Sequence, residues 1–209
     1  MKRTAANIVR EYGPFPGVSA VHGVSFDGTN IWMATGDALN AVDPDSGEIV
    51  RKLDVRAQAG TAFDGQHLFQ IAEGRIQKID PDSGRVLATI PTPEGGAAGM
   101  AWAEGSLWVG QHRNRKIHRV DPQTGAILST IESNRFVTGV TWLGDELWHG
   151  TLEEGQSELR RINPKSGEVL EQIDMPPGIV VSGLESNGRD AFFCGGGNSG
   201  KVRAVRRPK

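Results

Sequence analysis

Cysteine, charge imbalance and long apolar runs are all scarce in this chain of 209 residues. With a single cysteine, it cannot form an intrachain disulfide framework or a cysteine-rich zinc module. A formal net charge of −2 gives no long-range attraction for nucleic acids or acidic membranes. No apolar run approaches the roughly 20 residues of a membrane span, and the N-terminus lacks the apolar stretch of a signal peptide. We therefore expect a cytoplasmic protein without nucleic-acid or membrane partners.

Glycine, in contrast, is abundant, with 28 residues, and much of it recurs at regular intervals. Proline presets φ in four recurring turns, an Asp or Asn side chain caps the backbone, and the closing glycine takes positive φ. The closing glycines lie 37, 41 and 42 residues apart, in the segments Asp43–Gly47, Asp80–Gly84, Asp121–Gly125 and Asn163–Gly167. Short alternating runs flank each turn, a pattern typical of antiparallel strands.

A second set of glycines opens one strand in every repeat, at positions 23, 60, 99, 139 and 183. Each unit of about 40 residues holds four short strands and no helical period, which is the signature of a β-propeller blade. We predict an all-β, five-bladed β-propeller that forms a single domain, with four antiparallel strands per blade. The expected blades are about 18–55, 56–93, 94–134, 135–177, and 178–209 completed by 4–12.

The fifth repeat lacks its outermost strand, because the chain ends shortly after Val205. The N-terminal segment Asn7–Tyr12 resembles the outer strand Glu48–Leu53 of the first repeat. We therefore predict that residues 4–12 pair with residues 201–206 and close the ring, which removes an open sheet edge. An open stack of five sheets is the alternative.

The turns of the repeats differ in how much they vary. Turns between strands one and two, and between strands three and four, are nearly uniform and lie on one face of a propeller. Turns between strands two and three, together with the connections between blades, form the other face and differ from blade to blade. Variable loops on a repeated scaffold usually carry function. We expect a small-molecule or peptide ligand, or a protein partner, on this variable face at the mouth of the channel. The candidate ligand-binding residues are Gln70, Glu73, Gln111, His112, Arg113 and Asn198.

Glu185 departs most clearly from the repeat. Two positions after the strand-opening glycine, the other repeats carry small residues, namely Ser25, Ala62, Ala101 and Thr141. We expect an aromatic residue opposite this slot in each blade, Phe192 in the fifth. A buried carboxylate requires a partner, a proton or a wet cavity. Glu185 is therefore either one half of a salt bridge to a neighbouring blade or a general acid/base in the channel.

Two histidines are further candidates for proton transfer. His22 is the only residue that is ionisable near neutral pH among those just before the strand-opening glycines, and it belongs to a blade that neighbours Glu185. His149 is a polar exception on the second strand of its blade. For both, a packing role is the alternative.

No motif indicates a cofactor or a metal. The run Gly195–Gly200 fits G-x-G-x-x-G, but a strand follows it instead of the helix that phosphate binding needs. Cys194 precedes this run and is interpreted as a small buried filler. The pair His112 and His118 has no recognised metal spacing.

Several repeat segments resemble a broad group of bacterial propellers. The segments are Gly99–Trp102, Ser106–Gly110 and Lys116–Gly125, and the group includes the streptogramin lyases, the YVTN/quinoprotein-like propellers and the plant-type glutaminyl cyclotransferases. Five blades of this length look most like the cyclotransferases. That resemblance implies cyclisation of an N-terminal glutamine without a metal, by a catalytic glutamate. The family's Glu-Gly-Trp-Gly-Leu segment is echoed by Glu94–Met100, with the glutamate displaced from the strand glycine.

Three functions follow as hypotheses, and whether the chain is an enzyme is left open among them. The first is a glutamine cyclotransferase-like enzyme that uses general acid/base catalysis by Glu185, His22 and His149 at the channel mouth. The second is a non-catalytic propeller that binds a ligand or a protein. The third is a C–O lyase similar to the streptogramin lyases, which are seven-bladed and use a metal.

Overall fold

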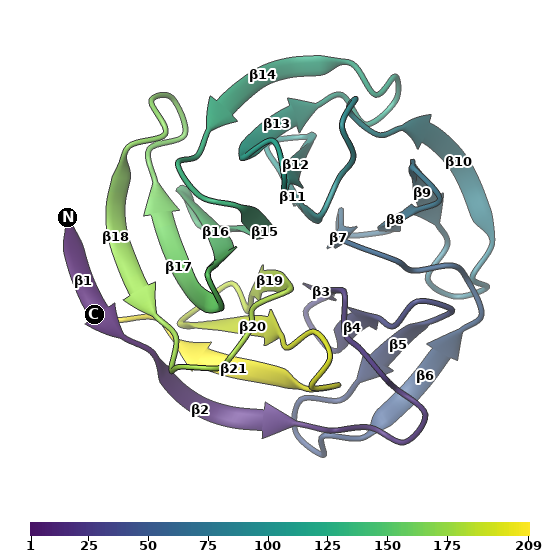
Figure 1. Cartoon of the computed structure of the whole chain (residues 1–209). Coiled ribbons are helices and arrows are strands. Elements are labelled where there is room, and N and C mark those ends of the chain that lie inside the picture. Colours follow the sequence, from purple (N-terminus) through teal and green to yellow (C-terminus); the bar gives the residue numbers. More distant parts are fainter.

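Five small antiparallel sheets surround a central axis, each with its innermost strand at the centre and its outermost strand at the rim (Figure 1). The computed structural model describes all 209 residues and contains no helix. None of the chain therefore forms a helix long and apolar enough to cross a membrane. The predicted five-bladed β-propeller is confirmed.

The blades follow one another along the chain, and their strands run from the centre outward. Blade one consists of β3 (Gly23–Phe26), β4 (Ile31–Ala34), β5 (Leu39–Val42) and β6 (Ile49–Leu53). Blade two consists of β7 (Thr61–Phe63), β8 (Leu68–Ala72), β9 (Arg75–Ile79) and β10 (Val86–Pro91). Blade three consists of β11 (Gly99–Ala103), β12 (Ser106–Gln111), β13 (Lys116–Val120) and β14 (Ile127–Glu132). Blade four consists of β15 (Val137–Leu143), β16 (Glu146–Glu153), β17 (Gln156–Ile162) and β18 (Val169–Asp174). Blade five consists of β19 (Gly183–Ser186), β20 (Ala191–Gly195), β21 (Val202–Arg206) and the N-terminal β2 (Asn7–Tyr12).

The Asp-Pro turns join the third and fourth strands as their sequence predicts. In the first of them, Asp43 Oδ1 accepts the backbone N–H groups of Asp45 and Ser46 at 2.7 and 2.9 Å. Gly47 closes the turn with a φ of 78°, a conformation that glycine adopts without a steric penalty. The same carboxylate or amide cap recurs at Asp80, Asp121 and Asn163.

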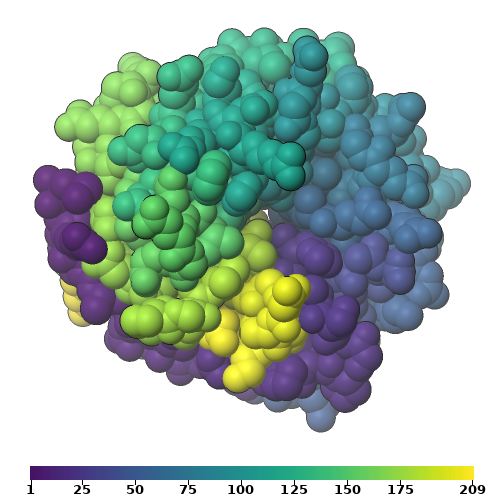
Figure 2. All heavy atoms as spheres, viewed as in Figure 1, coloured from purple at the N-terminus to yellow at the C-terminus, as the bar shows by residue number.

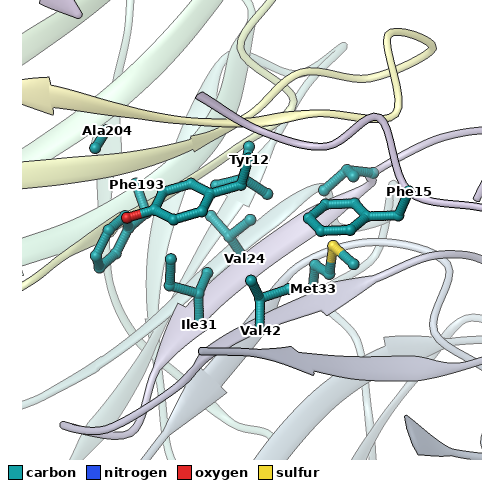
Figure 3. Close-up of a cluster of buried hydrophobic side chains, with 10 residues drawn as sticks. Tyr12, Phe15, Val24, Ile31, Met33, Val42, Phe193 and Ala204 are labelled. Atoms are coloured by element: carbon teal, nitrogen blue, oxygen red, sulfur yellow. The ribbon is translucent and has the colours of Figure 1, made fainter. Parts of the chain in front are cut away.

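The hydrophobic core lies between the blades. Five separate clusters of buried side chains fill the spaces between neighbouring sheets. In the cluster between blades five and one, the rings of Tyr12 and Phe193 lie 6.4 Å apart, and Met33 and Val42 pack from blade one (Figure 3). Each blade is therefore stabilised mainly by its neighbours, as in other repeat folds.

The five strand-opening glycines form a narrow ring, which we call the glycine collar (Gly23, Gly60, Gly99, Gly139 and Gly183). A Cβ atom added to Gly60 would lie 2.5 Å from the backbone nitrogen of Met100 in the next blade. Each of the other four would likewise meet the backbone of the following blade. The absence of a side chain at these positions lets the inner strands approach one another around the channel.

The N-terminal segment closes the ring but divides between two blades. The prediction that this segment completes blade five is confirmed for β2, which pairs antiparallel with β21, from Asn7 opposite Arg206 to Tyr12 opposite Val202. It is wrong for residues 4 and 5, because β1 (Lys2–Ala5) pairs parallel with β18 of blade four. The outer edge of β18 is not paired with any other strand, and it carries acidic side chains opposite the basic residues of β1. Arg3 forms an ion pair with Asp174 at 2.6 Å. Both chain termini lie on this side of the molecule (Figure 1).

Candidate functional site in the central channel

Two positions after each collar glycine, the inner strands carry a second set of equivalent residues, of which Ala62 and Ala101 pack in cores between blades and Ser25 and Thr141 contact Glu185. We call this set the channel ring; its members are Ser25, Ala62, Ala101, Thr141 and Glu185. The first four are buried, whereas Glu185 keeps some accessible surface although protein atoms surround its carboxylate. That combination is expected for a group inside a narrow channel. Glu185 is the only ring member with a charge-bearing side chain.

The carboxylate of Glu185 is held by hydrogen bonds and by no cation. Its Oε1 accepts the hydroxyl of Thr141 at 2.5 Å and the backbone N–H of Ser186 at 2.8 Å. Its Oε2 accepts the hydroxyl of Ser25 at 3.2 Å. None of the chain's ion pairs includes Glu185, and no charged group influences its ionisation. The salt-bridge interpretation is therefore wrong.

Burial sets the ionisation of this carboxyl group. Desolvation raises the pKa of Glu185 from 4.5 to about 7, and the hydrogen bonds from Thr141, Ser186 and Ser25 oppose the rise. Burial disfavours the charged form of an acid, so the direction matches the apolar surroundings. A carboxyl with this pKa accepts and donates protons near neutral pH.

The aromatic residue opposite Glu185 is Phe193, so the expectation of Phe192 is wrong. Ser25 pairs with Trp32 in blade one, but Glu185 pairs with Phe193 in blade five. The reason is a first hairpin turn that is one residue longer in blade five. Phe193 packs against Phe26 of blade one, with ring centroids 5.3 Å apart. The same shift places Cys194 against Leu184, where it is buried and where desolvation raises its pKa to about 12.

A cavity of about 300 Å³ opens on the variable face, at the mouth of the channel. We call it the mouth pocket. Figure 2 views the molecule from the side of the β20–β21 turn (yellow) and shows a narrow opening near the centre of the ring. The residue before each collar glycine contributes to its lining: His22, Ala59, Ala98, Thr138 and Ser182. The lining contains no Asp, Glu, Lys or Arg, and Glu185 lies on the other side of the glycine collar.

Two of the predicted residues, His22 and His112, line the mouth pocket. His112 stacks on Phe136 with ring centroids 4.7 Å apart and an interplanar angle of 18°. Desolvation, assisted by the nearby Arg113, lowers the pKa of His112, which favours its neutral form at pH 7. The Arg115 guanidinium lies 4.4 Å from the Phe136 ring centroid.

Gln70 and Gln111 are buried and support the backbone. The Gln70 amide donates to the carbonyls of Ala59 and Ile71, at 3.0 and 2.9 Å, and its oxygen accepts the Thr61 hydroxyl. The Gln111 amide donates at 2.8 Å to each of the carbonyls of Glu94 and Gly96. Their polar atoms are thus committed within the protein, so we assign neither to ligand binding.

The remaining ligand-binding candidates are exposed on turns of the variable face. Glu73 lies on the β8–β9 turn, and its N–H donates to the side chain of Gln58, which lines the mouth pocket. Arg113 and Asn198 lie on the β12–β13 and β20–β21 turns and are not part of the lining.

His149 lies apart from the channel ring. It is 1 % exposed, and it lines a different cavity, of about 240 Å³, next to Glu132 and Glu168. Its Nδ1 lies 3.2 Å from the carbonyl oxygen of Gly150, and desolvation lowers its pKa to about 4. His149 and Glu185 therefore belong to separate sites. No three His, Cys, Asp or Glu side chains gather in a group fit to hold a metal ion.

Sequence reasoning missed the two hydroxyl groups that hold Glu185. Ser25 and Thr141 occupy the same repeat position as Glu185, in the two blades that flank it. The small size of these two residues is the feature that makes Glu185 an exception in the repeat. Both also carry a hydroxyl group, which is the feature that could have predicted their hydrogen bonds to the carboxylate.

These observations define a class, the five-bladed β-propellers, here with a buried carboxyl on an innermost strand. The family model described as "Outer membrane protein assembly factor BamB" matches residues 28–172 and, in a second placement, residues 72–208. The chain belongs to this family of PQQ-like propellers. No curated protein matches its sequence.

Solved structures with a similar fold span the whole chain. The glutaminyl cyclase of Myxococcus xanthus superposes with a TM-score of 0.80 at 19 % identity, over 98 % of this chain and 97 % of that one. The WD40 repeats of RRP9 give a TM-score of 0.60 at 10 % identity, over 96 % and 99 % of the two chains. The hydrazine synthase of Kuenenia stuttgartiensis gives 0.55 at 16 % identity, over 85 % of this chain and 56 % of that one. These likenesses establish the fold.

Proposed function

We propose that the protein is an enzyme that cyclises the N-terminal glutamine of a peptide, with Glu185 as the general acid/base. The observation that carries the proposal is the environment of Glu185, a carboxyl surrounded by protein on the innermost strand of blade five, with a pKa of about 7 and no cationic partner. The fold shared with a glutaminyl cyclase over nearly the whole of both chains supports the choice of reaction.

The reaction needs a group that moves one proton twice. The α-amino nitrogen of the substrate attacks the side-chain amide carbon and forms the new C–N bond of the ring. Ionised Glu185 takes the proton that the attacking nitrogen loses. Protonated Glu185 then gives it to the amide nitrogen, which leaves as ammonia when the old C–N bond breaks. A group with a pKa near the working pH performs both transfers efficiently.

The mouth pocket supports the same proposal from the substrate side. Its volume of about 300 Å³ suits the end of a peptide, and its uncharged lining suits a segment without side-chain charge. The glycine collar adds no side chain between this pocket and the channel ring. The collar backbones themselves lie too close together to pass a peptide, so in this proposal the peptide end binds in the mouth pocket and the inner strands move apart before Glu185 reaches it.

Release of ammonia from a peptide with N-terminal glutamine tests the proposal, and mass spectrometry of the product confirms the ring closure. We expect E185Q to lose at least about 100-fold in kcat, the usual scale for a general acid/base. E94Q is the matched control, because Glu94 is the exposed glutamate that echoes the cyclotransferase motif. Full activity in E185Q, loss of activity in E94Q alone, or no ammonia release by the unaltered protein would each overturn the proposal.

A second candidate is ligand binding without chemistry. It is favoured by the position of Glu185 outside the mouth-pocket lining, with both carboxylate oxygens already hydrogen-bonded to the protein. The description of the matching family as an assembly factor is compatible with binding a protein. Calorimetry would distinguish the two candidates, since a pure binder takes up the peptide unchanged and E185Q binds equally well. No observation favours the lyase alternative.

A further inference from the structure

The two oxygens of Glu185 have different hydrogen-bond environments, and this difference indicates which of them carries the exchangeable proton. The inference rests on the proposed role of Glu185 as a general acid/base. It concerns Thr141 and Ser25, which flank Glu185 in the channel ring from blades four and one.

Oε1 faces two donors, and one of them cannot reverse its direction. That donor is the backbone N–H of Ser186 at 2.8 Å. The other donor is the Thr141 hydroxyl at 2.5 Å. Thr141 Oγ1 also accepts the Ser186 N–H at 3.0 Å, which occupies one of its two lone pairs while its proton is donated to Glu185. A proton on Oε1 would confront the fixed N–H and require the Thr141 hydroxyl to turn away, which favours an accepting oxygen here.

Oε2 faces one partner that can reverse its direction. Ser25 Oγ lies 3.2 Å away and has no other side-chain hydrogen bond. A serine hydroxyl donates to a carboxylate and, after rotation, accepts from a carboxylic acid. Protonation of Oε2 therefore costs no hydrogen bond. The other members of the ring, Ala62 and Ala101, are small and cannot compete for this proton.

We infer that Glu185 exchanges its proton at Oε2, on the side of blade one, and that Thr141 is the positioning residue that holds Oε1. No titratable group faces the carboxyl from any element packed against it. The groups that bind the carboxylate are the hydroxyls of Ser25 on β3 and Thr141 on β15 and the backbone N–H of Ser186, and no charged group of any neighbouring strand acts on its ionisation. The proton therefore responds to these hydroxyl groups rather than to another charge.

The test compares three variants of the full chain by infrared titration of the protonated carboxyl band, which is assigned to Glu185 by its absence in E185Q. T141V removes a strong donor to the charged form and should raise the midpoint by roughly one pH unit. T141S restores the hydroxyl and should restore the midpoint. S25A should move it by much less, because the Ser25 hydroxyl serves both protonation states. If T141V does not fold, T141A replaces it, since alanine already occupies this ring position in two blades.

The pH–rate profile of cyclisation provides the second measurement, and its acidic limb should move with the infrared midpoint in T141V but not in T141S. An unchanged midpoint in T141V, or an equal or larger shift in S25A, would overturn the inference. A wild-type band that titrates near pH 7 and shifts as expected, in a protein that releases no ammonia, would refute the proposed function alone. The two failures are thus distinguishable.

Discussion

A single carboxyl group among uncharged neighbours links the stability of this protein to pH. The pKa of Glu185 is raised by burial to about 7, from an ordinary value of 4.5, so the native state binds this proton more tightly than the unfolded chain does. The stabilisation from this group is fully present below pH 4.5 and is lost as the pH rises through 7. Its ionised form is thus the unfavourable state of the native protein.

Substitution of Glu185 by glutamine should remove this dependence. We expect E185Q and the unaltered protein to differ little in their pH response below pH 4.5, and the variant to gain up to about 3 kcal/mol in relative stability by pH 8. Glutamine also mimics the protonated carboxyl, with its NH₂ group in the place of Oε2. Urea unfolding at a series of pH values measures the difference, with E94Q as the control. A constant difference across the series would show that the carboxyl ionises as freely in the native state as in the unfolded chain.

At this scale, the sequence predicted which residue is unusual but not what contacts it. Glu185 stood out because the repeat supplies four other residues for comparison at the same position. Gln70 and His149 were also exceptions within the repeat, yet both are buried. Periodicity identifies the strand and the side of the pleat on which a residue lies. It does not indicate whether that side faces the channel or a neighbouring sheet.

At the scale of the strand, the inner strands are constrained by the collar glycines. Gly60 has an ordinary backbone conformation, and only the closeness of Gly99 and Met100 in the next blade restricts its side chain. Gly74, on the β8–β9 turn of the same blade, presents the opposite case, since its φ is 71° and nothing lies near its missing side chain. A substitution at Gly60 therefore tests the effect of steric contact alone, and a substitution at Gly74 tests the effect of backbone conformation alone.

Alanine at these two positions should give different losses of stability. We expect G60A to cost roughly 3 kcal/mol or more, because two backbone segments must move apart to admit the methyl group. G74A should cost only about 1–2 kcal/mol, from the left-handed conformation alone. Chemical denaturation of both variants measures these losses. Equal values would mean that the inner strands separate easily and that the collar does not restrict the ring.

Strand boundaries were more predictable than strand partners. The glycine and Asp-Pro markers located nearly every strand because they correspond to local turn chemistry. The pairing of Phe193 with Glu185 was not predicted, because one extra residue in a turn shifts the register of the strands. The parallel pairing of β1 with β18 was not predicted either. It depends on the unpaired outer edge of β18 and on acidic side chains about 170 residues away in the chain.

At the scale of the whole molecule, the number of blades and the closure of the ring followed from the repeat, since a missing outer strand and a leftover N-terminal strand complement one another. The structure adds that the first 12 residues connect two blades, with β1 on blade four and β2 on blade five. Tyr12, at the end of β2, is 5 % exposed and belongs to the core between blades five and one.

Two truncations should separate the contributions of these strands. Removal of residues 1–6 deletes β1 and its ion pairs, in which the Lys2 and Arg3 side chains are exposed, and should leave a cooperative transition with a small loss of stability. Removal of residues 1–12 also deletes β2, which exposes the edge of β21 and opens the core at Tyr12. We expect this variant to aggregate or to lose its single transition. Thermal unfolding followed by circular dichroism distinguishes the two, and identical melting of the longer truncation and the full chain would contradict the role of β2.

The pairing of the first strands with the last has a consequence for synthesis on the ribosome. Lys2 pairs opposite Glu171 and Asn7 opposite Arg206, so the two partners emerge only 169 and 199 residues later. Blades one to three have all their strands long before that point, while the N-terminal segment stays unpaired. This pairing joins strands far apart in sequence, and contacts of such separation form slowly. The nascent chain therefore carries an unpaired strand throughout this interval, and an unpaired strand edge is prone to aggregation until its partner has been made.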